Sequence, residues 1–324
     1  MIEIELALHS YSLVQHFRRK PGFGVFDFVA LAADRGFTGI NLNLNRPDWR
    51  HLTGQSPEHL VRVGRLLAER GMSLEVDTSG TDPHHLRALL LAARALGARN
   101  LRTYTRHRGS HAAVWERTLA DLRAAVADAE RAGIPLVLEN HEEFTGPALA
   151  ALVEAVGSPW LRVLFDYGNS QPVWEDPQAC LEALLPLSAT MHLKDHLILR
   201  PEHAPDGRLS TLGVAIGQGA LPIMAMTRRL VAAGHRRLVF ENVWAYRAPF
   251  APPPAAPAVT LGQGSFRYAE PPFEELRVVP DQEAAAAADL EAFLAAEIRA
   301  LDEGLAWLRA ACAAEGWRLR QAAP

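Results

Sequence analysis

Four short apolar runs in the second half of the chain decide its fold, and each ends at a side chain that could bind a metal ion. They are Pro135-Leu-Val-Leu-Glu139, Leu161-Arg-Val-Leu-Phe-Asp166, Ala189-Thr-Met-His192 and Arg237-Leu-Val-Phe-Glu241. Short continuous apolar runs are typical of strands that are buried on both faces of a parallel sheet. Because a polar residue stands at the carboxyl end of each run, the four side chains are predicted to meet at one end of the sheet.

Strand-like and helix-like patterns alternate along nearly the whole chain. Further strand-like segments cover residues 3–9, 38–45, 73–77 and 100–105, and helical periodicity follows each of them, with glycines such as Gly97 and Gly133 at the predicted helix ends. Eight alternations predict an α/β fold, a (β/α)8 TIM barrel in a single domain over residues 1–324. An open doubly wound sheet is the rival fold, but no G-x-G-x-x-G motif follows the first strand.

Two segments near the carboxyl terminus stand apart from this alternation. Residues 245–280 are rich in proline and aromatic residues and follow the eighth strand, so we expect a long insertion that forms a lid over the mouth of the barrel or an oligomer contact. Residues 282–320 are rich in alanine and are predicted to form the closing helix of the barrel.

Composition narrows the classes of partner. The net charge of −4 gives no basic face for nucleic acid or anionic lipid. The two cysteines, Cys180 and Cys312, do not make a disulfide framework, and no apolar run approaches the ~18 residues that span a bilayer. The acidic start runs directly into a strand pattern and does not resemble a signal peptide. We therefore expect a cytoplasmic protein that binds neither nucleic acid nor membranes.

The residue types at the four strand ends predict the kind of metal. Three carboxylates and one imidazole suit a hard divalent cation, with Mn²⁺ first and Mg²⁺, Co²⁺ or Zn²⁺ as alternatives. Such an ion could hold a substrate hydroxyl and carbonyl in its open positions and stabilise an enediolate.

The sequence around these residues resembles a known family. Leu138-Glu-Asn-His141, Asp166-Tyr-Gly-Asn169, His192-Leu-Lys-Asp195 and the later Gly217-Gln-Gly219 are similar to motifs of the xylose-isomerase-like TIM barrel family, also called the sugar phosphate isomerase/epimerase or AP endonuclease family 2 fold. The resemblance covers about residues 3–245. Members of this family include ketose epimerases, hydroxypyruvate isomerases, inosose and dehydroshikimate dehydratases, and catalytic subunits of enzymes that cleave C-glycosides.

This resemblance implies roles for individual residues. Glu139, Asp166, His192 and Glu241 would be the metal ligands, and in epimerases the two glutamates also exchange the substrate proton from opposite faces. A carboxylate that is held by a metal through one oxygen can still take a proton on the other. His141 lies two residues beyond Glu139 and, in dehydratase and lyase members, a histidine at this place can act as the base.

Five further residues are predicted to contact the substrate: His9, Asn169, Lys194, Trp244 and Arg106. Lys194 lies two residues beyond His192 and should face the same side of the strand. Trp244 follows Glu241 and could stack against a sugar ring. Asn169 stands where some epimerases of the family carry a histidine near the metal, which argues against close kinship with those epimerases.

The main functional hypothesis is therefore a divalent-metal-dependent isomerase or epimerase of a small sugar or keto acid in carbohydrate metabolism. It would remove a proton next to a carbonyl and form a metal-stabilised enediolate. The alternative is a metal-dependent lyase, such as a dehydratase or a 3-oxo-C-glycoside-cleaving subunit, with His141 as base. The DNA-repair endonucleases of this fold need extra histidines on strands two and three, where this chain has Asn43, Asn45 and Asp77. A barrel that only binds is the remaining alternative. The expected assembly is a homo-oligomer, with an accessory subunit if the enzyme cleaves C-glycosides.

Overall fold

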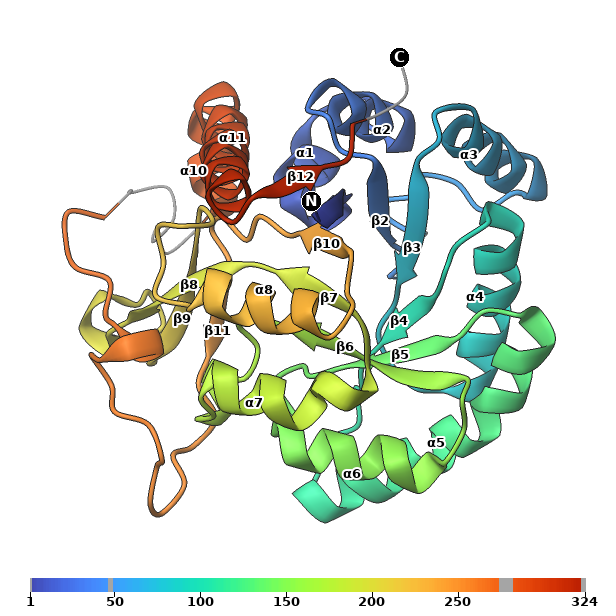
Figure 1. The fold of residues 1–324 in the computed structure, drawn as a ribbon. Coiled ribbons are helices and arrows are strands. Elements are labelled where there is room, and N and C mark those ends of the chain that lie inside the picture. The colour runs from blue at the N-terminus through green and yellow to red at the C-terminus, as the bar shows by residue number, and fades with distance from the viewer. Residues whose placement is uncertain (1, 46–48, 274–281, 322–324) are drawn as a thin grey trace.

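Eight parallel strands form a closed barrel in the computed structural model, which describes residues 2–45, 49–273 and 282–321 (Figure 1). The strands are β1 (Ile2–His9), β2 (Gly39–Asn43), β3 (Ser73–Asp77), β4 (Leu101–Thr103), β5 (Leu136–Glu139), β6 (Leu161–Asp166), β7 (Ser188–Leu193) and β10 (Arg237–Phe240). Each pairs with its neighbour in chain order, and β10 pairs with both β7 and β1, which closes the ring. The predicted (β/α)8 barrel is confirmed.

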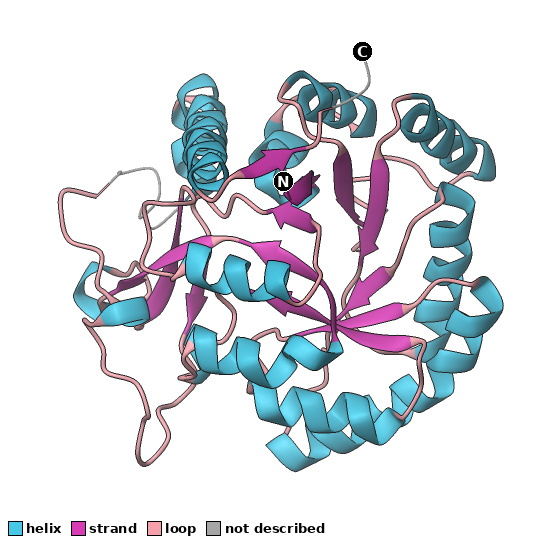
Figure 2. Ribbon diagram, viewed as in Figure 1, coloured by secondary structure: helices cyan, strands magenta, loops and turns pink. Residues whose placement is uncertain are grey.

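Helices cover the outside of this barrel, as Figure 2 shows. They are α1 (Val14–Arg19), α2 (Val25–Asp34), α3 (Pro57–Glu69), α4 (Pro83–Leu96), α5 (His111–Ala132), α6 (Gly146–Val156), α7 (Pro177–Leu184), α8 (Ile223–Ala232), α10 (Gln282–Ala288) and α11 (Leu290–Ala314). Their ends follow local chemistry. The hydroxyl of Ser56 accepts a hydrogen bond from the His59 amide and begins α3, while Gly97 and Gly133 adopt the left-handed conformation that ends α4 and α5.

The strands are apolar because both of their faces are buried, one against the helices and one inside the barrel. Charged side chains also lie inside the barrel, at its amino-terminal end. The hydroxyl of Thr190 lies 3.0 Å from both carboxylate oxygens of Glu75, and Arg237 lies 2.8 Å from that carboxylate. The charge of Glu75 inside the barrel is therefore compensated by Arg237.

A second, smaller sheet follows β7. It contains β8 (Asp195–Leu199), β9 (Ser210–Val214) and β11 (Arg247–Pro249), all antiparallel, and lies at one side of the barrel, at the left of Figure 1. Short 3-10 turns occur at Ser10–Leu13, Gln171–Val173, Leu185–Leu187, Pro201–His203 and Gly264–Phe266.

The proline- and aromatic-rich segment packs on the small sheet in the part that the structure describes, and the lid stays a prediction. Phe250 and Phe266 pack on Ile198 of the small sheet and bury their apolar surface there. Beyond Tyr246, none of the described residues up to Phe273 lines the cavity at the mouth of the barrel. Residues 274–281 lie outside the described part of the chain. The oligomer contact stays a prediction.

The carboxyl-terminal segment is also more divided than predicted. In place of one closing helix, α10 ends at Ala288, and the side chain of Asp289 accepts a hydrogen bond from the Ala292 amide at the start of α11. After α11, β12 (Trp317–Leu319) pairs in parallel with β1.

Candidate active site

The four predicted metal ligands lie together at the carboxyl-terminal end of the barrel. Glu139 and Asp166 are the last residues of β5 and β6, His192 is in β7, and Glu241 directly follows β10. All four side chains are buried. The parallel register brings them together, because Asp166 pairs with His192 and Glu139 pairs with Leu164.

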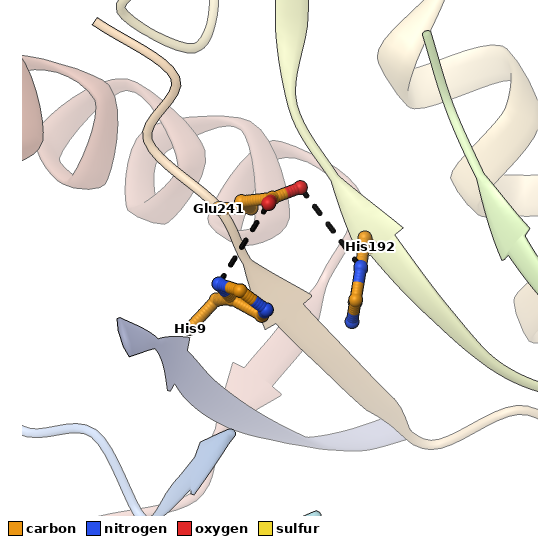
Figure 3. Close-up of side chains that lie close together, drawn as sticks. All are labelled: His9, His192 and Glu241. Atoms are coloured by element: carbon orange, nitrogen blue, oxygen red, sulfur yellow. Dashed lines mark ion pairs between the residues drawn. The ribbon is translucent and has the colours of Figure 1, made fainter. Parts of the chain in front are cut away.

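Two overlapping groups of side chains could hold a metal ion. Glu139, Asp166 and His192 offer ligand atoms within 4.8 Å of one another, and so do His9, His192 and Glu241 (Figure 3). His192 belongs to both groups, with its Nδ1 3.5 Å from Glu139 Oε1 and 3.9 Å from Glu241 Oε2. The imidazole therefore lies between the two glutamates.

Two permanently charged side chains lie among these carboxylates. The Lys194 ammonium is 2.8 Å from both Asp166 Oδ2 and Glu241 Oε2, and Arg102 Nη2 is 2.9 Å from Glu139 Oε2. Lys194 thus lies at the mouth, as predicted from its spacing, and it contacts two of the carboxylates that are predicted to bind the metal.

The charges shift the pKa values of the carboxyl groups in opposite directions. Burial alone would raise the pKa of Glu139 and of Glu241, but Arg102 lowers the first and Lys194, with His9 and His192, lowers the second. Burial raises the pKa of Asp166 to about 6, because the negative charges of Glu139 and Glu241 oppose the effect of Lys194. Glu241 is therefore ionised more readily than Asp166, because His9 and His192 add to the effect of Lys194 on Glu241, whereas two neighbouring carboxylates oppose it at Asp166.

Asp77 and Arg102 also belong to the site, although neither was predicted from the sequence as a site residue. His9 Nε2 donates to Asp77 Oδ2 at 2.7 Å, and this carboxylate lies 3.7 Å from Arg102 Nε and 3.6 Å from His192 Nε2. Asp77 ends β3, and Arg102 is the middle residue of β4. An arginine inside a barrel strand was the available signal, because a buried guanidinium needs a buried carboxylate beside it.

Aromatic rings line the cavity above these charges, which has a volume of about 370 Å³. The ring of Tyr104 stacks on His141 with centroids 3.8 Å apart, and the Tyr246 hydroxyl donates to Glu142 at 2.6 Å. His141 lies beyond the end of β5 and 3.4 Å from Glu143. Burial alone would lower the pKa of His141, but Glu143 and Glu139 raise it above its ordinary value.

Most of the residues predicted to contact substrate line this cavity: His9, Asn169, Lys194 and Arg106. Asn169 Nδ2 donates to Glu139 Oε1 at 3.3 Å and so helps to orient that carboxylate. Trp244 is placed differently. Its ring is buried against Phe293 of α11, with ring centroids 5.2 Å apart. It therefore packs in the core and is not placed to stack on a sugar ring. Tyr246, two residues further along, lines the cavity together with Tyr11 and Tyr104.

The chain matches known proteins in sequence and in structure. A model of the family described as xylose isomerase-like TIM barrel matches residues 29–261. The chain is 30% identical over 155 residues to a 3-oxo-isoapionate decarboxylase of Pectobacterium atrosepticum, a match that covers 48% of this chain and about half, 56%, of the relative.

Two solved structures have the same fold. The D-psicose 3-epimerase of Clostridium cellulolyticum superposes with a TM-score of 0.61 at 14% identity, over 93% of this chain and 98% of that chain. The IolI protein, solved with a zinc atom, superposes with a TM-score of 0.57 at 14% identity, over 74% and 89% of the two chains. None of the helices in the described ranges is long and apolar enough to cross a membrane. With its closed barrel, and with a family model that matches most of its length, this chain belongs to the xylose isomerase-like TIM barrel family.

Proposed function

We propose that this protein is a divalent-metal-dependent enzyme that generates an enediolate from a small hydroxy-ketone or oxo acid. The observation that carries this proposal is the convergence of four buried ligand side chains at one end of the barrel. Of their ligand atoms, Glu139 Oε2 lies beside the Arg102 guanidinium, Asp166 Oδ2 and Glu241 Oε2 lie beside the Lys194 ammonium, and His192 Nδ1 makes no hydrogen bond within the described residues. Three carboxylates and one imidazole this close together form a ligand set that supports a site for a divalent cation.

The charge of the site fits a 2+ ion. Four carboxylates lie at this end of the barrel, on Asp77, Glu139, Asp166 and Glu241, against two permanent cations, Arg102 and Lys194. The difference of −2 is large for a buried cluster, and a divalent ion would cancel it. Oxygen-rich ligation with one imidazole suits Mn²⁺ first, with Mg²⁺, Co²⁺ or Zn²⁺ as alternatives. When bound, such an ion would polarise a substrate carbonyl and stabilise the negative charge that develops on its oxygen.

A lyase that acts on an oxo acid agrees best with the contacts of the two glutamates. Each lies within 2.9 Å of a permanent cation, Arg102 for Glu139 and Lys194 for Glu241, which weakens both as bases. Decarboxylation next to a carbonyl needs no base. The carbon–carbon bond breaks, carbon dioxide leaves, the electron pair moves onto the carbonyl oxygen, and a proton then returns to carbon. His141 lines the cavity and is the residue that we assign as its donor. The decarboxylase relative supports this choice.

The isomerase or epimerase remains the second candidate because of the placement of the same glutamates. Glu139 and Glu241 come from the ends of two different strands, and both lie near His192. A reaction with two bases on opposite faces of the substrate requires such a pair. In this reaction a proton leaves and returns, and no carbon is lost.

Incubation of the Mn²⁺-loaded protein with 3-oxo sugar acids and with ketoses in D₂O tests these reactions. For a decarboxylase, mass spectrometry should show a product that has lost carbon dioxide and gained one deuterium. A product that keeps all its carbon atoms and has exchanged one hydrogen for deuterium would identify the isomerase. His192→Gln should lower the affinity for Mn²⁺, measured by electron paramagnetic resonance, about 100-fold, because a ligand is lost. Asp302→Asn, at an exposed pair with Arg35, is the matched control. Equal Mn²⁺ affinity of His192→Gln and the unmodified protein would refute the proposed site.

A further inference from the structure

A second cavity adjoins the metal-ligand cavity and opens beside it. This outer cavity has a volume of about 590 Å³. It shares six lining residues with the inner one: Tyr11, Arg18, Asn43, Asn45, Tyr104 and Arg106. A ligand that occupies the inner cavity therefore has a continuous path into the outer one.

Three arginines from separate parts of the chain line the outer cavity. Arg18 belongs to α1, Arg50 follows β2, and Arg106 follows β4. The one carboxylate in this lining, on Asp82, already accepts the His85 amide at the start of α4. Three guanidinium groups against one carboxylate make the outer cavity strongly positive.

These arginines have no carboxylate partner in the described part of the chain, unlike several of their neighbours. Arg19, next to Arg18, forms an ion pair with Glu283, and Arg102 pairs with Glu139. No ion pair joins Arg18, Arg50 or Arg106 to a described carboxylate. Their guanidinium groups are exposed and remain available for a ligand.

The other polar rings of the outer cavity are already engaged. His51 Nδ1 lies 2.8 Å from the Ser10 hydroxyl, and His85 Nε2 lies 2.9 Å from that of Thr78. Neutral hydroxyl and amide groups also line this cavity, and the three arginines are its permanently charged donors. Guanidinium groups bind carboxylates and phosphates through paired hydrogen bonds.

Aromatic contacts connect the two cavities. The Arg106 guanidinium lies over the Tyr104 ring, 5.5 Å from its centroid, and the His141 ring stacks on Tyr104 with centroids 3.8 Å apart. A ligand with one end at Arg106 and the other at His141 would therefore lie along the Tyr104 ring.

We propose that the substrate carries an oxyanion apart from its reacting group, a carboxylate or a phosphate that is not lost in the reaction, which Arg18, Arg50 and Arg106 hold in the outer cavity while the reacting hydroxy-ketone or oxo acid lies at Glu139 and Glu241. This inference rests on the proposed function and adds a substrate class to it. Neutral sugars would lack the contact with the arginines and bind more weakly.

Calorimetry on the Mn²⁺-loaded protein with three ligands of one carbon skeleton tests this inference. The ligands are sorbitol, D-gluconate and sorbitol 6-phosphate, and the arms distinguish a carboxylate from a phosphate. At least one anion should bind roughly tenfold or more tighter than sorbitol, since charge-assisted hydrogen bonds are the strong ones. The triple variant Arg18→Gln/Arg50→Gln/Arg106→Gln should lose this preference while its Mn²⁺ affinity is retained.

The matched control replaces three exposed arginines outside both cavities, Arg65→Gln/Arg70→Gln/Arg208→Gln, and should keep the preference. Equal affinity for all three ligands, no binding of either anion, or a preference that survives in the triple variant would each overturn the inference. Failure of the protein to bind Mn²⁺ in the same samples would instead overturn the proposed function, so that the two failures are distinguishable.

Discussion

At the scale of single residues, the main feature of the candidate site is the contact between buried carboxylates and side-chain cations. Lys194 contacts Asp166 and Glu241, two of the four side chains proposed to bind the metal, at 2.8 Å each. An ammonium and a divalent ion compete for the same oxygens, so Lys194 must lose at least one of these contacts when an ion binds. This residue therefore links the stability of the metal-free protein to its affinity for metal.

Replacing Lys194 should change these two properties in opposite directions. In Lys194→Met, two buried carboxylates lose their cation, which should destabilise the metal-free protein by about 3 kcal/mol. The affinity for Mn²⁺ should rise roughly tenfold or more, because a repelling charge has gone. Thermal unfolding in EDTA and Mn²⁺ titration by paramagnetic resonance measure the two effects. Lys20→Met, at an exposed position, serves as control. A lower affinity for Mn²⁺ in Lys194→Met would show that the ammonium supports the ion.

At the scale of elements, the loop from Gly217 to Leu221 is built around one carboxylate. Asp195 Oδ2 accepts hydrogen bonds from the amides of Gly217 and Gly219 at 2.9 and 2.8 Å, and Oδ1 accepts one from Leu221 at 3.2 Å. The sequence motif Gly-Gln-Gly is explained by this close approach, since a Cβ at Gly219 would lie 2.0 Å from Asp195 Oδ1. Asp195 thus fixes the loop before α8 and, with it, the start of β8 that follows His192 and Lys194.

Gly219→Ala should therefore destabilise the protein, because the added methyl group displaces the Asp195 carboxylate from its amide donors. We expect a loss of about 1–3 kcal/mol in the free energy of unfolding by urea. The adjacent Gln218→Ala, which removes only an exposed contact with Glu303, should change it by less than about 0.5 kcal/mol. Equal stability of the two variants would mean that the loop adapts without cost.

At the scale of the whole molecule, folding buries histidines that stay neutral. Burial lowers the pKa of His51 well below its ordinary value of 6.5, with help from the positive charges around it, and burial with the charge of Lys194 lowers the pKa of His196 to about 3. Both rings lie on the side of the barrel that carries the cavities, one against Phe17 and one near Tyr246. The unfolded chain takes up protons on both rings as pH falls below about 6.5, but the folded chain does not.

The stability that these two histidines contribute is therefore fully present above pH 6.5 and is lost as pH falls toward 3. In metal-free protein, His51→Gln/His196→Gln should reduce the dependence of the unfolding free energy on pH in this window by up to about 2.7 kcal/mol per pH unit, which corresponds to two protons. Urea unfolding at several pH values measures this slope. The exposed His84→Gln is the control and should leave it unchanged. An unaltered slope in the double variant would show that both rings are protonated in the folded protein.

The sequence by itself determined the barrel and the four residues proposed as ligands. Strands buried on both faces leave continuous apolar runs, and polar residues at their carboxyl ends must meet in a parallel barrel, so Glu139, Asp166, His192 and Glu241 could be placed from local pattern alone. Only the tertiary structure decided which charges compensate them. Arg102 and Asp77 act through contacts between β3, β4 and β5, and the cluster of Arg18, Arg50 and Arg106 joins three segments that are distant along the chain. The sequence also misplaced Trp244, because burial of an aromatic ring depends on the surface that folding brings to it, here α11.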